Sequence, residues 1–204
     1  VMAGVLINEK DIVKLEEIGV KDSKLLSKAK REELFEQIKE LVVDFRISVV
    51  SPEEVDGALK EEDSNLNWLE ADTSSEIVNQ FKSDMVIVDC PSINVSAYKK
   101  YFFGRLSKEV GKRAELIVEH KADLNYVVVG AASILAKVTR DREVEDLKKR
   151  FGVDFGSGYL SDEKTQIFLQ ENFDKKKYGF LFRKTWKPFQ NLVKEKGQSR
   201  LGDF

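Results

Sequence analysis

Residues 85–120, MVIVDCPSINVSAYKKYFFGRLSKEVGKRAELIVEH, contain two short apolar runs separated by a longer mixed segment. The first run, MVIVDC (85–90), is continuous and ends at an Asp and a Pro, as in a strand that is buried on both faces. Residues 95–111 favour a helix, and AELIVEH (114–120) favours a second strand. A strand, a helix and a strand in this order predict the repeating unit of a layered α/β fold.

The same alternation extends toward both ends of the chain, which predicts an α/β fold with a central sheet. We expect one domain over residues 1–150, a helical C-terminal subdomain over 151–196 and a tail over 197–204. Ser27 is the expected N-cap of the first long helix. The further predicted elements are strands at 1–7 and 42–51 and helices at 28–41, 65–82, 126–150, 162–173 and 186–196.

The composition limits the classes of protein to which the chain can belong. Of its 204 residues, 42% are hydrophobic and 34% are charged, which favours a folded core and excludes disorder as the main state. The single Cys90 excludes an internal disulfide framework, and the single His120 excludes mechanisms that need two histidines. No apolar run is long enough to span a membrane, and the apolar start of the chain is interpreted as a strand, not a signal peptide. These features favour a cytoplasmic location.

Charge is distributed unevenly along the chain. Residues 1–123 carry 18 basic and 25 acidic residues, whereas residues 124–204 carry 16 basic and 11 acidic residues. A basic cluster in the second part is either a solvated face or a surface that binds phosphates. The densest basic cluster consists of Lys175, Lys176, Lys177, Arg183, Lys184 and Lys187.

Two acidic residues follow predicted strands. Asp89 closes the strand MVIVDC, and Asp123 comes three residues after AELIVEH. Ligands of layered α/β sheets gather at the carboxyl ends of strands, and carboxylate oxygens are ligands for Mg²⁺. The pair is therefore a candidate metal site, although each residue could equally be a helix cap or a turn residue.

Three further segments carry polar groups that suit a nucleic-acid ligand. His120 is a candidate general acid or a hydrogen-bonded structural residue, and Lys121 beside it must reach water or an anion. The loop KDSK (21–24) is either a polar connection or a phosphate-binding loop. The turn GSGY (156–159) combines flexible backbone with an aromatic hydroxyl, which suits the sugar or base of a nucleotide.

The C-terminal tail carries apolar residues at helical spacing. Gln198 is followed by Leu201 and then by Phe204. One helical turn would present these side chains to a groove on a partner protein, and the alternative is a frayed terminus.

Together these segments resemble the type 2 ribonucleases H (ribonuclease HII), and the archaeal members most closely. The matching stretches occur in the family's order and cover nearly the whole chain. The combination of HKAD (120–123) with AASILAK (131–137) is highly specific. The full set is GVKDSKLLS (19–27), VDC (88–90), EHKAD (119–123), AASILAKVTRD (131–141), GSGY (156–159) and KTWK (184–187).

This resemblance implies a ribonuclease H-like fold, with a central mixed sheet flanked by helices and a helical C-terminal subdomain. It implies hydrolysis of the RNA strand in RNA/DNA hybrids, and cleavage 5′ of single ribonucleotides in duplex DNA. The family uses two divalent metals, Mg²⁺ or Mn²⁺, held by four carboxylates, of which Asp89 and Asp123 match the third and fourth. Tyr159 matches the tyrosine that reads the RNA–DNA junction. Weaker candidates for substrate contacts are Lys21, Ser23, Lys121, Ser133 and Lys137.

The resemblance also implies a partner. The tail with Gln198, Leu201 and Phe204 is similar to the motif by which some archaeal members dock on the replication sliding clamp (PCNA). We expect a monomer with no membrane attachment.

One departure from the family is large. The family's first strand, which ends in DEAGRG and supplies the first two carboxylates, has no counterpart, because VMAGVLI (1–7) matches the second strand. Asn8 and Glu9 lie too far along the chain to replace it. Either the sequence is incomplete and the parent enzyme active, or the polypeptide is an inert module that binds hybrids and the clamp. A third reading, a junction-cleaving nuclease with a ribonuclease H-like fold, is disfavoured by the HKAD and GSGY pair.

Overall fold

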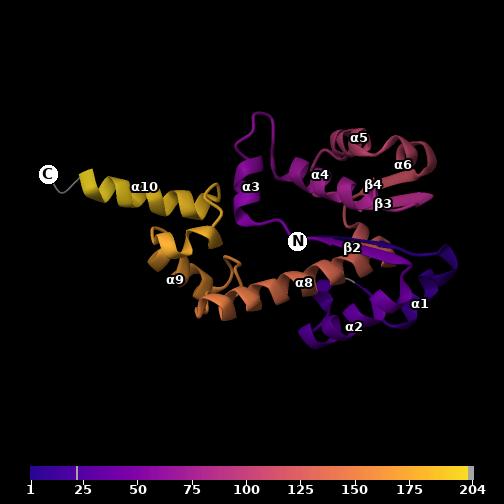
Figure 1. Cartoon of the computed structure of the whole chain (residues 1–204), viewed down its shortest axis with the longest axis horizontal. Coiled ribbons are helices and arrows are strands. Elements are labelled where there is room, and N and C mark those ends of the chain that lie inside the picture. Colours follow the sequence, from indigo (N-terminus) through magenta and orange to yellow (C-terminus); the bar gives the residue numbers. More distant parts are fainter. Residues whose placement is uncertain (22, 202–204) are drawn as a thin grey trace. The chain divides into compact units, whose positions relative to one another are not determined.

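The computed structural model describes the backbone of residues 1–21 and 23–201 and the side chains of residues 1–21 and 23–198. The chain divides into two compact units, and Figure 1 labels most of their helices and strands. Unit 1 comprises Val1–Val49 and Leu66–Arg140, and unit 2 comprises Val50–Asn65 and Asp141–Phe204. The sequence did not indicate that residues 50–65 pack with the C-terminal part, and the domain boundary expected at residue 150 stays a prediction.

The strands of unit 1 form two separate two-stranded sheets. Strand β1 (Met2–Leu6) pairs antiparallel with β2 (Asp44–Ser48), and β3 (Met85–Asp89) pairs parallel with β4 (Glu115–Glu119). The prediction of a mixed α/β fold is confirmed. The single central sheet that we expected is not formed, because no described strand joins the two pairs.

The first core of unit 1 lies between helices and the β1–β2 sheet. Helix α2 (Lys28–Leu41) begins where predicted, because the Ser27 hydroxyl accepts a hydrogen bond from the Lys30 backbone N–H at 3.2 Å. Its buried face packs against α1 (Ile12–Glu17) and the first part of α8 (Val127–Phe151). The fully buried side chains of this core include Leu15, Leu34, Ile38, Ile134 and Leu135.

The second core of unit 1 lies between the β3–β4 sheet and helices α4 (Leu66–Val78) and α5 (Val95–Arg105). Only one face of β3 is buried, because Val86 and Val88 enter this core while Met85 is 51% exposed. The expectation that this strand is buried on both faces was therefore wrong. The helix predicted over 95–111 is also interrupted, because Ser107 caps a separate helix, α6 (Lys108–Arg113).

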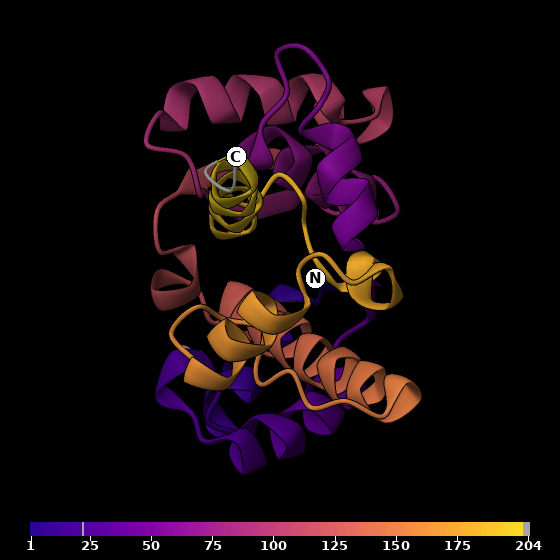
Figure 2. The same ribbon diagram turned by 90° about the vertical axis from the view of Figure 1, so that its left-hand side faces the viewer.

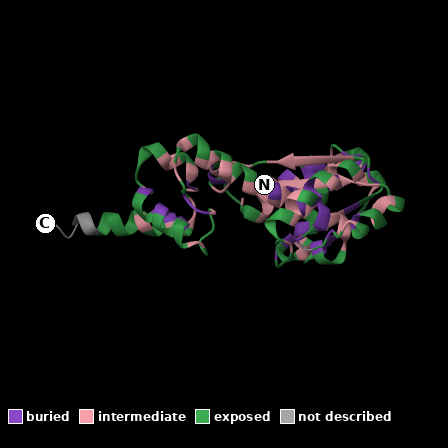
Figure 3. Ribbon diagram, turned by 90° about the horizontal axis from the view of Figure 1, so that it is seen from below, coloured by how far each residue is buried: buried purple, intermediate pink, exposed green. Residues whose placement is uncertain are grey.

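Unit 2 is helical around an aromatic core. It contains α3 (Pro52–Ala58), α9 (Glu163–Asn172), the 3-10 helix η3 (Lys176–Leu181) and α10 (Lys187–Leu201), together with the last part of α8. Figure 2 views α10 nearly along its axis, and Figure 3 shows that most of its described length is exposed. The buried core consists of Phe155, Phe168, Leu169, Phe182 and Phe189.

The remaining elements are short. They are η1 (Glu9–Asp11), η2 (Ser23–Leu25) and α7 (Ala122–Asn125). Within the described residues, no helix combines the length and apolar character needed to cross a membrane.

Candidate functional site

Asp89 and the segment that carries Asp123 meet at one end of the β3–β4 sheet. Because β3 and β4 run parallel, both strands reach the same edge. Asp89 ends β3, and its Oδ1 accepts a hydrogen bond from the backbone N–H of Ala122 at 3.0 Å. That N–H belongs to the first residue of α7, so Asp89 also satisfies a helix donor. The sequence left open whether Asp89 is a metal ligand or a helix cap. In the structure the Asp89 side chain caps α7 and can still bind a metal ion through its other oxygen.

The Asp123 carboxylate is buried and faces a cation. The residue is 8% exposed, and its Oδ2 lies 3.5 Å from Lys24 Nζ. The Lys24 side chain is 78% exposed, so this contact is a weak, solvent-screened one. The sequence did not single out Lys24, although it belongs to the KDSK loop.

His120 and Lys121 form the turn that leads from β4 into α7. Lys121 has a left-handed backbone with φ of 58°, and its side chain is exposed. His120 Nδ1 lies 3.0 Å from the Cys90 carbonyl oxygen. A carbonyl oxygen only accepts, so Nδ1 carries a proton. This hydrogen bond supports the structural role of His120 between the two strand ends.

The loop before α2 lies against the start of α8. A Cβ atom on Gly130 would lie 3.3 Å from the Asp123 carbonyl oxygen and 3.7 Å from the Lys21 carbonyl oxygen, so glycine permits this close approach. Ser23 is buried, and Arg31 donates to its carbonyl oxygen at 3.1 Å. Asp22 lies outside the described residues.

Ser133 and Lys137 follow one turn apart on α8, in unit 1, and both are half-buried. Unit 1 therefore holds all the candidate site residues except Tyr159 and the tail.

The side-chain oxygens at this site could provide part of the coordination of a divalent cation such as Mg²⁺. Two carboxylates from Asp89 and Asp123 match the way in which Mg²⁺ is bound, through one or two carboxylates, waters and substrate phosphates. Among the described residues, no group of three or more His, Cys, Asp or Glu side chains is placed to hold a metal ion. A cation here would depend on water and substrate oxygens for the rest of its coordination.

Tyr159 lies in unit 2, on a loop that is fixed by the side chains of half-buried Asp162 and buried Thr165. The backbone N–H of Ser157 donates to Asp162 Oδ2, and that of Gly158 donates to Thr165 Oγ1 at 2.9 Å. The Thr165 hydroxyl in turn donates to the Phe155 carbonyl oxygen at 3.0 Å. The hydrogen bonds from Ser157 hold the pKa of Asp162 below its usual value, so the carboxylate is ionised at neutral pH.

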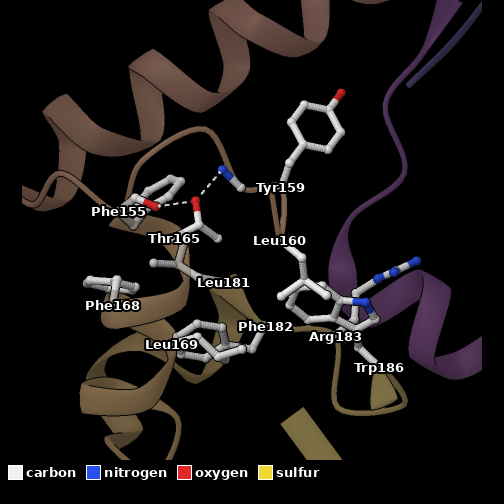
Figure 4. Close-up of a pocket in the computed structure, with 11 residues that line it drawn as sticks. Phe155, Tyr159, Leu160, Thr165, Phe168, Leu169, Leu181, Phe182, Arg183 and Trp186 are labelled. Carbon is white, nitrogen blue, oxygen red and sulfur yellow. Dashed lines mark hydrogen bonds between the residues drawn. The ribbon is translucent and has the colours of Figure 1, made fainter. Parts of the chain in front are cut away.

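A cavity of about 390 Å³ lies beside this loop (Figure 4). Aromatic and aliphatic side chains line it, and the Tyr159 ring projects away from the aromatic cluster. Tyr159 is 46% exposed, so its ring and hydroxyl are accessible to a ligand. The lining also includes Leu160, Phe168, Leu181, Phe182, Arg183 and Trp186.

The tail prediction falls mostly outside what the structure describes. Gln198 is exposed on α10. Leu201 is described only as the last helical residue, without its side chain, and Phe204 lies outside the described residues. Helix α10 extends beyond the end predicted at residue 196 and through Leu201.

Asp56 is a buried polar residue that the sequence did not reveal. It lies on α3, and it accepts hydrogen bonds from Lys184 and Thr185 within unit 2. The only local signal was the capping box of Ser51 and Glu54, which could have predicted α3 but not the buried contact.

Comparison with known proteins gives consistent matches over the chain. The family model described as ribonuclease HII matches residues 1–189. A ribonuclease HII from Methanococcus maripaludis is 42% identical over 206 residues, covering 98% of this chain and 83% of that protein.

Two solved structures are also similar. The ribonuclease H2 from Pyrococcus horikoshii OT3 matches with a TM-score of 0.79 and 38% identity, over 93% of this chain and 87% of that one. A chain of the PCNA:RNase HII complex from Archaeoglobus fulgidus matches with a TM-score of 0.77 and 34% identity, over 93% and 95% of the two chains.

Proposed function

The chain belongs to the ribonuclease HII family of type 2 ribonucleases H, and we propose that it hydrolyses both the RNA strand of RNA/DNA hybrids and the bond 5′ of single ribonucleotides in duplex DNA. The observation that carries this proposal is the hydrogen bond between Asp89 and the first residue of α7. It joins the end of β3 to α7, and we infer from the resemblance to the family's motifs that Asp89 and Asp123 are the third and fourth carboxylates of the metal site.

Asp89 and Asp123 would hold the divalent metal, Mg²⁺ or Mn²⁺. When bound, such a metal neutralises phosphate charge and lowers the pKa of a bound water. Burial keeps Asp123 fixed in α7, and the Ala122 N–H orients Asp89. Side chains that are held in place in this way need no reorganisation when the substrate arrives.

The remaining candidates would bind and select the substrate. We propose that Tyr159 contacts the sugar at the RNA–DNA junction, where the 2′-hydroxyl distinguishes RNA from DNA. Its fixed loop supports that role, because a preorganised ring loses little entropy on binding. The proposed phosphate and sugar contacts are Lys21, Ser23, Lys121, Ser133 and Lys137.

The alternative is a protein that binds hybrids and the clamp without cleaving. Among the described residues, no group of three or more His, Cys, Asp or Glu side chains is placed to hold a metal ion. With two carboxylates, less of the transition-state charge would be stabilised.

One assay separates the two functions. The 204-residue chain is incubated with a DNA duplex carrying one ribonucleotide, in Mg²⁺ or in Mn²⁺. We expect cleavage on the 5′ side of the ribonucleotide, leaving a 3′-hydroxyl and a 5′-phosphate on the ribonucleotide side. Salt-sensitive binding without metal-dependent cleavage would instead establish the non-catalytic binder.

We also propose that the tail docks on a sliding clamp. Support comes from the spacing of Gln198, Leu201 and Phe204 and from the similarity to a chain of a PCNA complex. Deleting residues 198–204 is expected to abolish clamp binding in a pull-down or calorimetric titration. Cleavage of short duplexes should be unaffected, since the deleted residues lie outside the candidate site. Unchanged affinity for the clamp after the deletion would contradict the docking proposal.

A further inference from the structure

Asp56 joins two distant parts of unit 2 through its buried carboxylate. The residue is 5% exposed and lies on α3. Its Oδ2 accepts from the backbone N–H of Lys184 at 2.6 Å, and its Oδ1 accepts from the backbone N–H and the hydroxyl of Thr185 at 2.9 and 2.6 Å. The carboxylate therefore fixes two consecutive backbone groups that follow it by 128 and 129 residues.

This arrangement keeps Asp56 ionised. Burial by itself raises the pKa of the carboxyl group, but the hydrogen bonds from Thr185 and Lys184 and the charge of Lys60 outweigh it, and the net shift is downward. The native pKa thus lies below the unfolded one, so the stabilisation is complete above about pH 4 and is lost as the pH falls further.

The segment that Asp56 fixes carries cations on both sides of the anchored residues. Lys184 and Lys187 are exposed, and neither forms an ion pair within the described part of the chain. Arg183 is half-buried, and its guanidinium carbon lies 5.9 Å from the centre of the Trp186 ring. Figure 4 shows Arg183 and Trp186 beside the purple ribbon of α3.

A buried carboxylate contributes little net stability to a fold, because the free-energy cost of its desolvation offsets much of the energy of its hydrogen bonds. The three hydrogen bonds to Asp56 instead hold the backbone at Lys184 and Thr185 in a defined conformation. Here that conformation spaces the cationic side chains of Arg183, Lys184 and Lys187 along one short segment. Clustered, fixed cations bind a row of phosphates at a lower entropic cost than mobile ones.

We propose that Asp56 is a positioning residue for nucleic-acid binding: it holds residues 183–187 so that Arg183, Lys184 and Lys187 contact phosphates of the substrate. This inference rests on the proposed function, since the ligand is the backbone of the same hybrid or duplex. Asp56 itself touches no phosphate.

The sign of the effect distinguishes positioning from simple electrostatics. The substitution Asp56→Asn removes a negative charge, which alone would strengthen binding to nucleic acid. The new side-chain amide keeps one oxygen as an acceptor, but its NH₂ group would face at least one of the donors that now have an acceptor, the backbone N–H of Lys184 or the groups of Thr185. The segment would therefore be held less firmly. We therefore expect weaker binding from a more positive protein.

The matched control is Asp63→Asn. Asp63 belongs to the same 50–65 segment, is exposed and has a backbone φ of 67°, which asparagine accommodates well. This control makes the same change in charge without disturbing the buried contact.

The experiment measures the affinity of both variants for a short RNA/DNA hybrid without divalent metal, at several NaCl concentrations. For Asp56→Asn we expect a Kd about 5–30-fold higher than that of the parent. The slope of log Kd against log [NaCl] should fall by about one or two, which corresponds to the loss of one or two phosphate contacts. In cleavage assays KM should rise with little change in kcat. Asp63→Asn should bind as tightly as the parent, or slightly more tightly.

Circular dichroism and thermal unfolding show whether each variant folds. If Asp56→Asn does not fold, the affinity is measured with Thr185→Val instead, because this variant loses only the hydrogen bond from the Thr185 hydroxyl to Asp56. We then expect Kd to rise about two- to fivefold. Equal or tighter binding by the folded Asp56→Asn variant, or by Thr185→Val in its place, would overturn the positioning role alone. Failure of the parent chain to bind the hybrid would overturn both this role and the proposed function.

Discussion

Replacing Asp123 or Asp89 by Asn is expected to abolish cleavage of a duplex carrying one ribonucleotide, with a loss in kcat of about 10²–10³ or more. Each substitution removes a negative charge that would hold the divalent metal, while the shape of the side chain is retained. The Asp89→Asn side chain would keep an oxygen for the Ala122 N–H, and Asp123→Asn loses only a weak contact with Lys24. Folding should therefore be preserved, which circular dichroism would confirm.

Asp84→Asn is the matched control. Asp84 is exposed just before β3, at the end of the strand opposite Asp89, and it pairs with Arg113. Its replacement should leave cleavage unchanged. If the parent chain gains thermal stability from MnCl₂, the two site variants should lose that gain and Asp84→Asn should keep it. Full activity in either site variant would refute the assignment of that residue.

Gly156→Ala is expected to destabilise unit 2 by about 2–5 kcal/mol, from left-handed strain and a steric clash together. Gly156 has a φ of 73°, and an added Cβ would lie 2.4 Å from Asp162 Oδ2 and 2.7 Å from Thr165 Oγ1. Those two side chains hold the backbone before Tyr159, so the clash would displace the loop. We expect a lower thermal midpoint and slower cleavage.

Gly152→Ala separates the two contributions. Gly152 has a φ of 61°, and no atom lies within 4 Å of the position of its added Cβ. Its replacement should cost only the backbone term, about 1–2 kcal/mol. Thermal or urea unfolding of both variants would measure the difference. Equal losses in the free energy of unfolding for the two substitutions would show that Asp162 and Thr165 move aside for the added Cβ without destabilising the protein.

Local patterns were sufficient to predict the elements that depend on neighbouring residues. Helix α2 has the predicted ends because Ser27 caps it and its apolar residues recur at helical spacing. Helix α3 was missed because a seven-residue helix gives too few repeats for a periodic pattern. The pairing of strands was not predictable in the same way, because β1 and β2 join residues that lie far apart in the sequence, such as Gly4 and Arg46.

In the candidate site, too, local features could be predicted from the sequence and contacts between distant segments could not. Asp89 and Asp123 could be predicted to share one edge, because two neighbouring parallel strands must end there. Nothing near Asp56 indicates that its partners are Lys184 and Thr185, since contacts between distant segments arise only when the chain packs.

The division of the strands into two pairs has a consequence for the protein in solution. Each of the four strands is hydrogen-bonded to one neighbour only, so every one of them has a lateral row of backbone groups without a strand partner among the described residues. Such rows are templates for pairing with another polypeptide.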